Sequence, residues 1–231
     1  MRTTQLHVAI DGPAASGKTT VSRGLAKRLH LLYLDTGAMY RALTVLALRT
    51  RTEADNAAAL RRLCEAGLVR VELDAAAPLG FRIFAGDTEL DEATLASNEV
   101  TAIVSTIAAH PAVREAMVAA QRAIAARGSV VMAGRDIGTV VLPDAAVKIF
   151  LTASVAARME RRRAQLERAG VDASAHRLKE EIEERDRLDR ERAVAPLIAA
   201  SDAHVIDSSA MSANQVIEEI SAIVERTRAT A

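Results

Sequence analysis

Residues 8–20, VAIDGPAASGKTT, limit the possible folds of this 231-residue chain more than any other stretch. The apolar run 8–10 predicts a short buried strand, and apolar residues at helical spacing after Lys18 predict a helix. The loop between them has the pattern GxxxxGKS/T, whose backbone N–H groups and helix N-terminus surround phosphate oxygens. The stretch therefore predicts a nucleoside triphosphate site in an α/β fold.

The residues of this phosphate loop have distinct expected roles. Lys18 supplies a positive charge for the β- and γ-phosphates, and the Thr19 hydroxyl can bind Mg²⁺. Thr20 also carries a hydroxyl and stays an alternative magnesium ligand, although the motif spacing favours Thr19. A Gly-rich turn with a surface lysine is the competing interpretation, and the strand and helix on either side argue against it. The residues expected to bind ATP here are Gly12, Pro13, Ala14, Ala15, Ser16, Gly17, Lys18, Thr19 and Thr20.

Strand and helix patterns alternate along most of the chain, which predicts a parallel sheet flanked by helices. Residues 66–96 differ, because two runs there alternate apolar and polar side chains and turn residues separate them. We expect a small antiparallel insertion, which cannot bury a core alone and must pack on a nearby helix. Further strands of the parallel sheet are expected near residues 31–34, 129–133, 147–151 and 204–206.

Composition and charge exclude several classes of protein. The 30 basic and 30 acidic residues balance, so a generally basic nucleic-acid-binding protein is not indicated. The single cysteine, Cys64, allows no intramolecular disulfide, and the five histidines lack metal-ligand spacing. The sequence begins with no signal-peptide pattern and has no run of about 18 apolar residues. We therefore expect a cytoplasmic protein with neither nucleic acid nor a membrane as its partner.

Two further groups of polar residues follow predicted strands. Thr36 and Arg41 come after one strand, and Arg135 and Asp136 come directly after another. Ligands of parallel sheets bind beyond the carboxyl ends of the strands, and the planar guanidinium of arginine suits phosphate. Asp35 has two interpretations, either a helix cap or a carboxylate near a transferred phosphate.

A charged helix is predicted over about 175–194, where Arg185, Asp189 and Arg192 share one face. Many other charges surround them, so spacing alone favours a solvated, salt-bridged surface over a binding role by about two to one. The arginines of the preceding predicted helix have the same two interpretations. For neither helix does spacing alone decide between a solvated surface and a binding role.

Several blocks of this sequence resemble bacterial cytidylate kinases, which are nucleoside monophosphate kinases of the P-loop class. The GRDIG and RDRLDRERAVAPL segments are much more specific than the phosphate loop. The resemblance is strong over about 8–48, 97–122 and 129–209 and weak over 50–96. The matching blocks are IDGPAASGKTT, LDTGAMYRA, GRDIGTVVLPDAAVKIFL, an arginine cluster at 158–162, and ERDRLDRERAVAPL.

The resemblance implies phosphoryl transfer from ATP to CMP and dCMP, with Mg²⁺, by direct in-line displacement. It also implies the three-layer P-loop fold of nucleoside monophosphate kinases, with a small antiparallel insertion and a short helical lid. We expect the protein to be a monomer, although nothing in the sequence bears on its oligomeric state. The implied core is 1–35, 127–154 and 195–231, the CMP-binding region is 36–126, and the lid with its adjoining helix is 155–194.

Catalytic and phosphate-binding roles carry over where the motifs match. Arg41, Arg135 and Arg192 would hold the CMP phosphate and, with Lys18, would serve catalysis. Thr36 stands where the family has serine or threonine. The implied magnesium-side residues are Thr19 and, as an alternative or addition, Asp35. The implied lid residues that approach ATP are Arg158 and Arg162.

The resemblance also implies which residues recognise the nucleoside. Ser105, Arg114 and Asp136 would contact cytosine, and Arg185 and Asp189 would contact the ribose. A carboxylate accepts a hydrogen bond from the cytosine N4 amino group, whereas uracil presents a carbonyl there. Asp136 would then be left facing an acceptor, which predicts a preference for CMP over UMP.

Three other functions compete with this interpretation. A kinase for another small acceptor would share the phosphate loop but would not need a carboxylate at Asp136 to accept from cytosine N4. A P-loop switch protein would need a guanine-reading N/T-K-x-D stretch, which the sequence lacks. A structural protein with a vestigial loop is disfavoured because every phosphate-loop position is retained.

Overall fold

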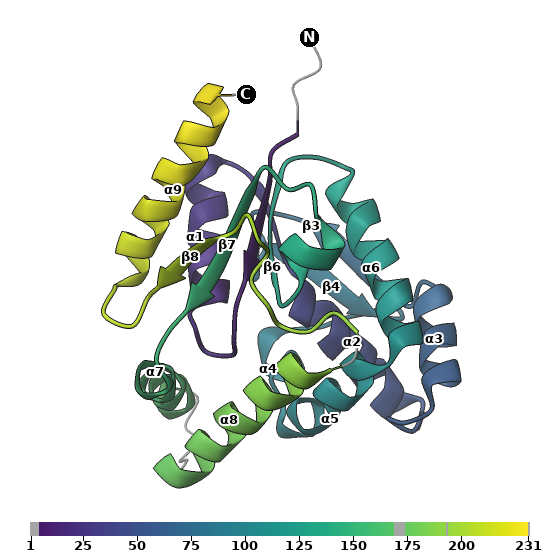
Figure 1. The fold of residues 1–231 in the computed structure, drawn as a ribbon. Coiled ribbons are helices and arrows are strands. Elements are labelled where there is room, and N and C mark those ends of the chain that lie inside the picture. The colour runs from purple at the N-terminus through teal and green to yellow at the C-terminus, as the bar shows by residue number, and fades with distance from the viewer. Residues whose placement is uncertain (1–4, 169–173, 193, 231) are drawn as a thin grey trace.

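A five-stranded parallel sheet in the order β2-β6-β1-β7-β8 forms the centre of the structure (Figure 1). The computed structural model describes residues 5–168, 174–192 and 194–230. The strands β1, β6 and β7 carry nearly continuous apolar runs, as expected where helices cover both faces. The strand bounds are β1 His7–Asp11, β2 Leu32–Asp35, β6 Val130–Gly134, β7 Val147–Thr152 and β8 His204–Asp207.

Helices lie on both faces of this sheet and complete the predicted three layers. Helices α1 (Lys18–Leu29) and α9 (Ala213–Thr230) pack against each other on one face, and α6 (Pro111–Ala125) lies on the other (Figure 1). Val21 and Leu25 turn the apolar side of α1 into the core, at the spacing that the sequence predicts. The α/β class and the order of the elements are therefore confirmed.

The register of β1 against β6 brings two distant loops together. His7 lies opposite Val130, and Asp11 lies opposite Gly134. Parallel strands end at the same edge of the sheet, so the phosphate loop after Asp11 and the loop after Gly134 leave the sheet side by side. The second loop forms a single π-type turn, η1 (Ile137–Val141), which sequence patterns did not predict.

The insertion is confirmed as a three-stranded antiparallel sheet, β3-β4-β5. It packs against helix α2 (Thr36–Arg49), and Ile83 is fully buried there within the main core. Arg82 lies on the other side of the same strand and forms an exposed ion pair with Glu89. The strand bounds are β3 Val69–Leu73, β4 Phe81–Ala85 and β5 Thr88–Glu89.

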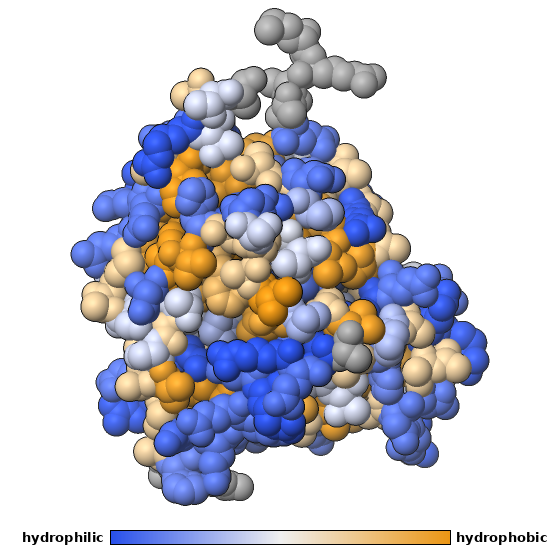
Figure 2. Space-filling view, viewed as in Figure 1, coloured by the Kyte–Doolittle hydropathy of each residue, from blue (hydrophilic) through white to orange (hydrophobic). Residues whose placement is uncertain are grey.

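Five further helices surround the insertion and the lower edge of the sheet, and two of them, α7 and α8, form the region predicted as a lid. Helices α7 (Val155–Arg168) and α8 (Ala175–Glu191) pack against each other, and Figure 2 shows hydrophilic side chains gathered over them. The sequence pattern predicts a gap between two helices at Gly170, which lies outside the described residues. Helix α8 ends at Glu191, earlier than predicted, so Arg192 lies just beyond it. The remaining helices are α3 Ala57–Glu65, α4 Glu92–Leu95 and α5 Asn98–Ala109.

No helix in the described part of the chain has both the length and the apolar character needed to cross a membrane.

Replacing Ile83 with alanine tests whether the insertion shares the cooperative core. Removing a fully buried isoleucine leaves a cavity, so we expect Ile83→Ala to lower the free energy of unfolding by about 2–5 kcal/mol. Urea unfolding followed by far-UV circular dichroism should still show one transition. The control is Arg82→Ala on the exposed face of the same strand, expected to change it by less than about 1 kcal/mol. A separate early transition in Ile83→Ala would instead show that the insertion unfolds alone.

Candidate active site

The phosphate loop has the backbone geometry that its sequence predicts. Gly12 and Gly17 have φ values of 151° and 95°, which favour glycine. A Cβ added at Gly12 would lie 2.0 Å from the carbonyl oxygen of Leu151, so no side chain fits there. Lys18 lies over the loop, where its Nζ donates to the carbonyl oxygen of Pro13 at 2.6 Å. Burial, followed by the neighbouring Arg135 guanidinium, lowers the pKa of Lys18 well below its usual value.

Thr19 and Asp35 lie in contact at the start of α2. Asp35 can therefore both cap that helix and lie beside the phosphate loop, the two roles considered for it from the sequence. The Thr19 hydroxyl donates to Asp35 Oδ2 at 3.0 Å, and Asp35 Oδ1 accepts from the Gly37 N–H at 2.9 Å. One carboxylate oxygen therefore caps the helix while the other faces the phosphate-loop threonine. Thr20 lines a cavity on another side of α1, so the geometry favours Thr19 as the residue at a metal.

No group of three or more histidine, cysteine or carboxylate side chains suited to a metal ion occurs among the described residues. An oxygen-preferring ion such as Mg²⁺ needs few protein ligands when phosphate oxygens supply the rest. Thr19 and Asp35 fit that arrangement.

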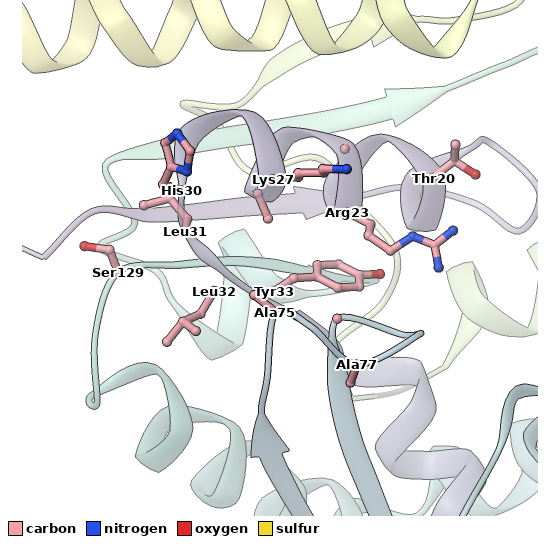
Figure 3. A pocket seen from close by; sticks show the side chains of 13 residues that line it. Thr20, Arg23, Lys27, His30, Leu31, Leu32, Tyr33, Ala75, Ala77 and Ser129 are labelled. Atoms are coloured by element: carbon pink, nitrogen blue, oxygen red, sulfur yellow. The ribbon is translucent and has the colours of Figure 1, made fainter.

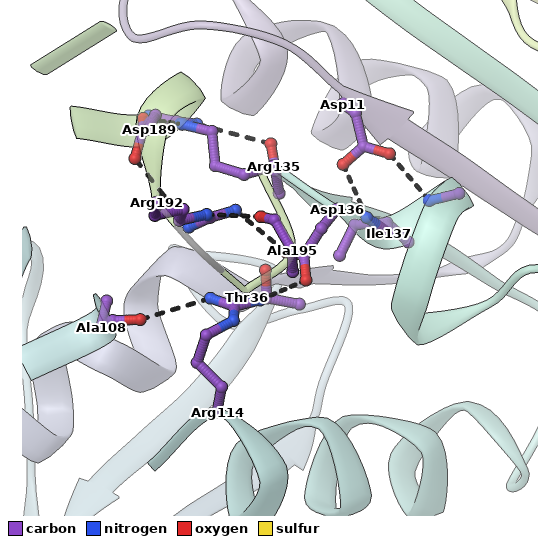
Figure 4. A network of polar contacts seen from close by, with 12 residues as sticks. Asp11, Thr36, Ala108, Arg114, Arg135, Asp136, Ile137, Asp189, Arg192 and Ala195 are labelled. Atoms are coloured by element: carbon purple, nitrogen blue, oxygen red, sulfur yellow. Dashed lines mark hydrogen bonds and ion pairs between the residues drawn. The ribbon is translucent and has the colours of Figure 1, made fainter. Parts of the chain in front are cut away.

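Arg135 and Asp136 extend from the end of β6 into a network of ion pairs (Figure 4). Arg135 Nε donates to Asp189 Oδ2 at 2.6 Å, and buried Asp136 pairs closely with Arg114. Arg192 NH2 lies 3.7 Å from Asp136 Oδ1. The network joins β6, α6 and the end of α8 at one edge of the sheet.

The charged face of α8 therefore points inward. Asp189 binds Arg135, and Arg185 is half-buried with no hydrogen-bond partner at its Nε. Burial, together with the nearby Arg135 and Arg41 guanidiniums, lowers the pKa of Arg185 to about 10. The interpretation that spacing favoured, a solvated salt-bridged face, is wrong here, because the partner charges come from strands and helices distant in sequence.

Three other predicted site residues lie on α2 and α5. The buried Thr36 hydroxyl donates to the Ala133 carbonyl oxygen at 3.0 Å and so ties α2 to β6. Arg41 NH1 donates to the Leu95 carbonyl oxygen at 2.8 Å, and Ser105 is half-buried on α5. Thr36 and Arg41 belong to the same edge of the sheet as Arg135.

The arginines of α7 contact the phosphate loop from outside. Arg158 is buried, pairs with Asp186 of α8 at 2.7 Å, and donates to the Ala14 carbonyl oxygen at 3.3 Å. Arg161, which the sequence did not single out as a site residue, donates to the Ser16 carbonyl oxygen at 3.1 Å. Its spacing of three residues from Arg158 was the available signal. Arg162 bonds Gln165 and contributes to the positive charge around Arg41.

A buried carboxylate that sequence reasoning missed lies immediately before the phosphate loop. Asp11 accepts hydrogen bonds from the Ile137 and Gly138 N–H groups at 2.8 and 2.7 Å (Figure 4). Burial, opposed by those two hydrogen bonds and increased by the charge of Asp136, raises the pKa of Asp11 to about 6. Nothing in its local sequence distinguishes it from a strand-end turn residue.

A cavity of about 810 Å³ lies away from this network, between α1, β2 and the turn that connects β3 to β4 (Figure 3). Tyr33, Ala77, Arg23 and Lys27 are among its lining residues. None of the residues expected to bind CMP lines it, so its size does not identify the reaction site.

Comparison with known proteins agrees with the sequence motifs over nearly the whole chain. The sequence pattern of the family described as cytidylate kinase matches residues 8–226. The chain belongs to the cytidylate kinase family. A cytidylate kinase from a Geobacillus species is 48% identical, with 95% of this chain and 96% of that protein aligned. Another, from Pelotomaculum thermopropionicum, is 47% identical, with 96% and 97% aligned.

A solved structure from Eubacterium ventriosum, described as an uncharacterized protein, has a TM-score of 0.52 and 12% identity. The alignment covers 96% of this chain and 99% of that one, and it shows a shared fold alone.

The raised pKa of Asp11 predicts how stability changes with pH in this cytidylate kinase family member. The folded chain holds the proton up to about pH 6 and the unfolded chain only to about 3.8. Stability from this group is therefore complete below about pH 3.8 and lost as pH rises through 6. The unfolding free energy of the wild type, relative to Asp11→Asn, should fall by about 3 kcal/mol across this window. Urea unfolding at several pH values measures it, and a constant difference would contradict it.

Proposed function

We propose that this protein transfers the γ-phosphoryl group of ATP to CMP and dCMP, forming CDP and dCDP for pyrimidine nucleotide metabolism. The observation that carries the proposal is the juxtaposition of the phosphate loop with Arg135 and Asp136, fixed by the pairing of Asp11 with Gly134. One loop is suited to a triphosphate, and the other supplies a cation and a carboxylate. Family membership supports the same reaction.

The phosphate loop and the helices above it would hold ATP. Lys18 would turn from the Pro13 carbonyl oxygen to the β- and γ-phosphates when the nucleotide enters. Region 155–194 would act as the lid, and Arg158 and Arg162 would serve the donor side. The contact of Arg158 with Ala14 supports this assignment, because it ties the lid to the loop.

Region 36–126, together with β6 and the end of α8, would hold the acceptor. Arg41, Arg135 and Arg192 would bind the CMP phosphate, with Thr36 beside them at the start of α2. Arg185 lacks a hydrogen-bond partner at its Nε, and burial, followed by the Arg135 and Arg41 guanidiniums, lowers its pKa to about 10. Such uncompensated positive charge favours an anion at this position. Arg185 and Asp189 would contact the ribose.

Cytosine would be read by Asp136, Arg114 and Ser105. The ion pair with Arg114 holds the Asp136 carboxylate in a fixed orientation, as an acceptor for the N4 amino group requires. Uracil presents an oxygen at that position, which would leave Asp136 opposed by another acceptor. The arrangement supports a preference for CMP over UMP.

Transfer would proceed by direct displacement. A phosphate oxygen of CMP attacks the γ-phosphorus, a new P–O bond forms, and the bond between the γ-phosphorus and the β–γ bridging oxygen breaks, so that ADP leaves. The attacking oxygen is already anionic near neutral pH, and no general base is needed. Lys18 and the arginines neutralise charge in the transition state, and a closed lid excludes water.

Thr19 and Asp35 would hold Mg²⁺ together with ATP, and the bound ion would neutralise charge on the β- and γ-phosphate oxygens. We also propose that the protein acts as a monomer. We also place the reaction in the cytoplasm.

Comparing acceptors tests this function and the role of Asp136. With ATP as donor, we expect CMP and dCMP to be phosphorylated faster than UMP, AMP or shikimate, and Lys18→Ala to be inactive. Asp136→Asn removes the charge that accepts from N4, so the CMP/UMP ratio of kcat/KM should fall by about tenfold or more. Coupled detection of ADP measures both. An unchanged ratio would remove Asp136 from base recognition, and faster turnover of AMP or UMP by the wild type would refute the proposed acceptor.

Two neighbouring threonines form a matched pair for the magnesium site. Thr19→Val removes the hydroxyl that faces Asp35, so we expect kcat to fall about tenfold or more and the Mg²⁺ requirement to rise. Thr20→Val removes a hydroxyl that lines the cavity on another side of α1, so we expect it to raise the Mg²⁺ requirement much less than Thr19→Val does. Initial rates across a Mg²⁺ titration measure both, and equal effects would contradict the assignment of Thr19.

A further inference from the structure

Asp11 connects the two loops of the proposed site without belonging to either. It is the last residue of β1, lies directly before Gly12, and is 4% exposed. Its Oδ1 accepts from the Ile137 N–H at 2.8 Å and its Oδ2 accepts from the Gly138 N–H at 2.7 Å. Those two residues directly follow Arg135 and Asp136.

We propose that Asp11 is a positioning residue that fixes the turn carrying Arg135 and Asp136 relative to the phosphate loop, and thereby aligns CMP with ATP. This inference rests on the proposed function.

The end of a helical turn explains why a distant carboxylate is needed. The first N–H groups of any helical turn lack partners within it, and buried ones require an acceptor. In η1 the turn's own bonds begin with Val140 N–H, which donates to the Asp136 carbonyl oxygen. The Ile137 and Gly138 N–H groups precede it, and Asp11 accepts from both.

The residue at the usual capping position has a different task. Asp136 stands directly before η1, but its side chain makes no capping hydrogen bond. Its carboxylate pairs with Arg114 and faces Arg192 instead. Asp11 takes over the cap and so leaves the Asp136 carboxylate available for the base.

The phosphate loop and the turn after β6 are both closely packed, so a change at Asp11 would alter how they lie relative to each other. A Cβ added at Gly138 would lie 3.2 Å from Lys148 Cδ and 3.5 Å from Asp11 Oδ2, and one at Gly134 would lie 2.6 Å from Thr36 Oγ1. Gly12 has no room for a side chain either. The turn and the phosphate loop are thus both confined, and Asp11 sets the distance between them.

Burying the Asp11 carboxylate lowers the stability of the fold, so its presence calls for a functional explanation. Asp11 places a second buried carboxylate near Asp136, and the nearby charge of Lys18 lowers the pKa of Asp11 less than burial raises it. Burying an ionisable group near a like charge disfavours folding. A strand-end asparagine or serine would avoid that cost, but neither can accept from two N–H groups through two equivalent oxygens.

The test is Asp11→Asn, which keeps the shape and replaces one accepting oxygen with an NH₂ group facing an N–H. We expect the KM for CMP to rise about tenfold or more and the CMP/UMP ratio to fall, while the KM for ATP stays within about twofold. The control is Ile149→Val, a buried change in the neighbouring strand β7 that leaves the two N–H bonds intact. It should lower stability and leave both KM values unchanged.

Hydrogen–deuterium exchange supplies a readout independent of catalysis. The amides of Ile137 and Gly138 should exchange about tenfold faster or more in Asp11→Asn than in Ile149→Val at equal global stability. Gly138→Ala is the second variant should Asp11→Asn not fold. It keeps the carboxylate and displaces the turn from Lys148, and it should raise the KM for CMP in the same way.

The outcomes separate this inference from the proposed function. An active wild type whose KM for CMP is unchanged in Asp11→Asn, or in Gly138→Ala where that variant is used, would overturn the role of Asp11 alone. A wild type that binds and phosphorylates no CMP would overturn the proposed function and this inference with it, whatever the exchange rates. Equal rises in the KM for ATP and for CMP would show general loosening of the site and also overturn positioning.

Discussion

Parallel pairing between β1 and β6 is the contact on which the rest of the site depends. These strands are distant in sequence, and their register places Asp11 opposite Gly134. Because parallel strands end at the same edge, the strand pairing makes the two loops that follow them neighbours. The helices, the insertion and the lid then add side chains around these two loops, whose proximity follows from the backbone hydrogen bonds between β1 and β6.

Positive charge is concentrated at that edge beyond what the nearby carboxylates neutralise. Burial and neighbouring guanidiniums lower the pKa of Arg185, and burial with Arg135 lowers that of Lys18. Holding like charges together disfavours the folded state, and an enzyme that binds two phosphorylated substrates gains transition-state stabilisation in return. The aliphatic core beneath, which includes fully buried Ile10 and Met132, supplies the stability that offsets this charge repulsion.

Sequence patterns predicted the order of the elements and the phosphate loop because both depend on local spacing. The insertion was found in the same way, from the alternation around Ile83. The inward orientation of Arg185 was not predictable from spacing, since a charged helical face looks the same whether its partners are water or distant side chains. The roles of Arg161 and Asp11 were missed because their partners are separated from them by more than a hundred residues. Whether Arg135, Asp136 and the others bind CMP stays a prediction.

Four aspartates at this edge show why residue type alone does not decide a role. Asp35 divides its oxygens between a helix N-terminus and Thr19, and Asp189 binds Arg135. Asp136 could cap its own turn but pairs with arginines, and Asp11 caps that turn from another strand. In each case the task follows from which donors lie within reach once the strands have paired. The phosphate loop predicts the donor nucleotide, and the division of work among these carboxylates is the physical basis on which we propose the choice of acceptor.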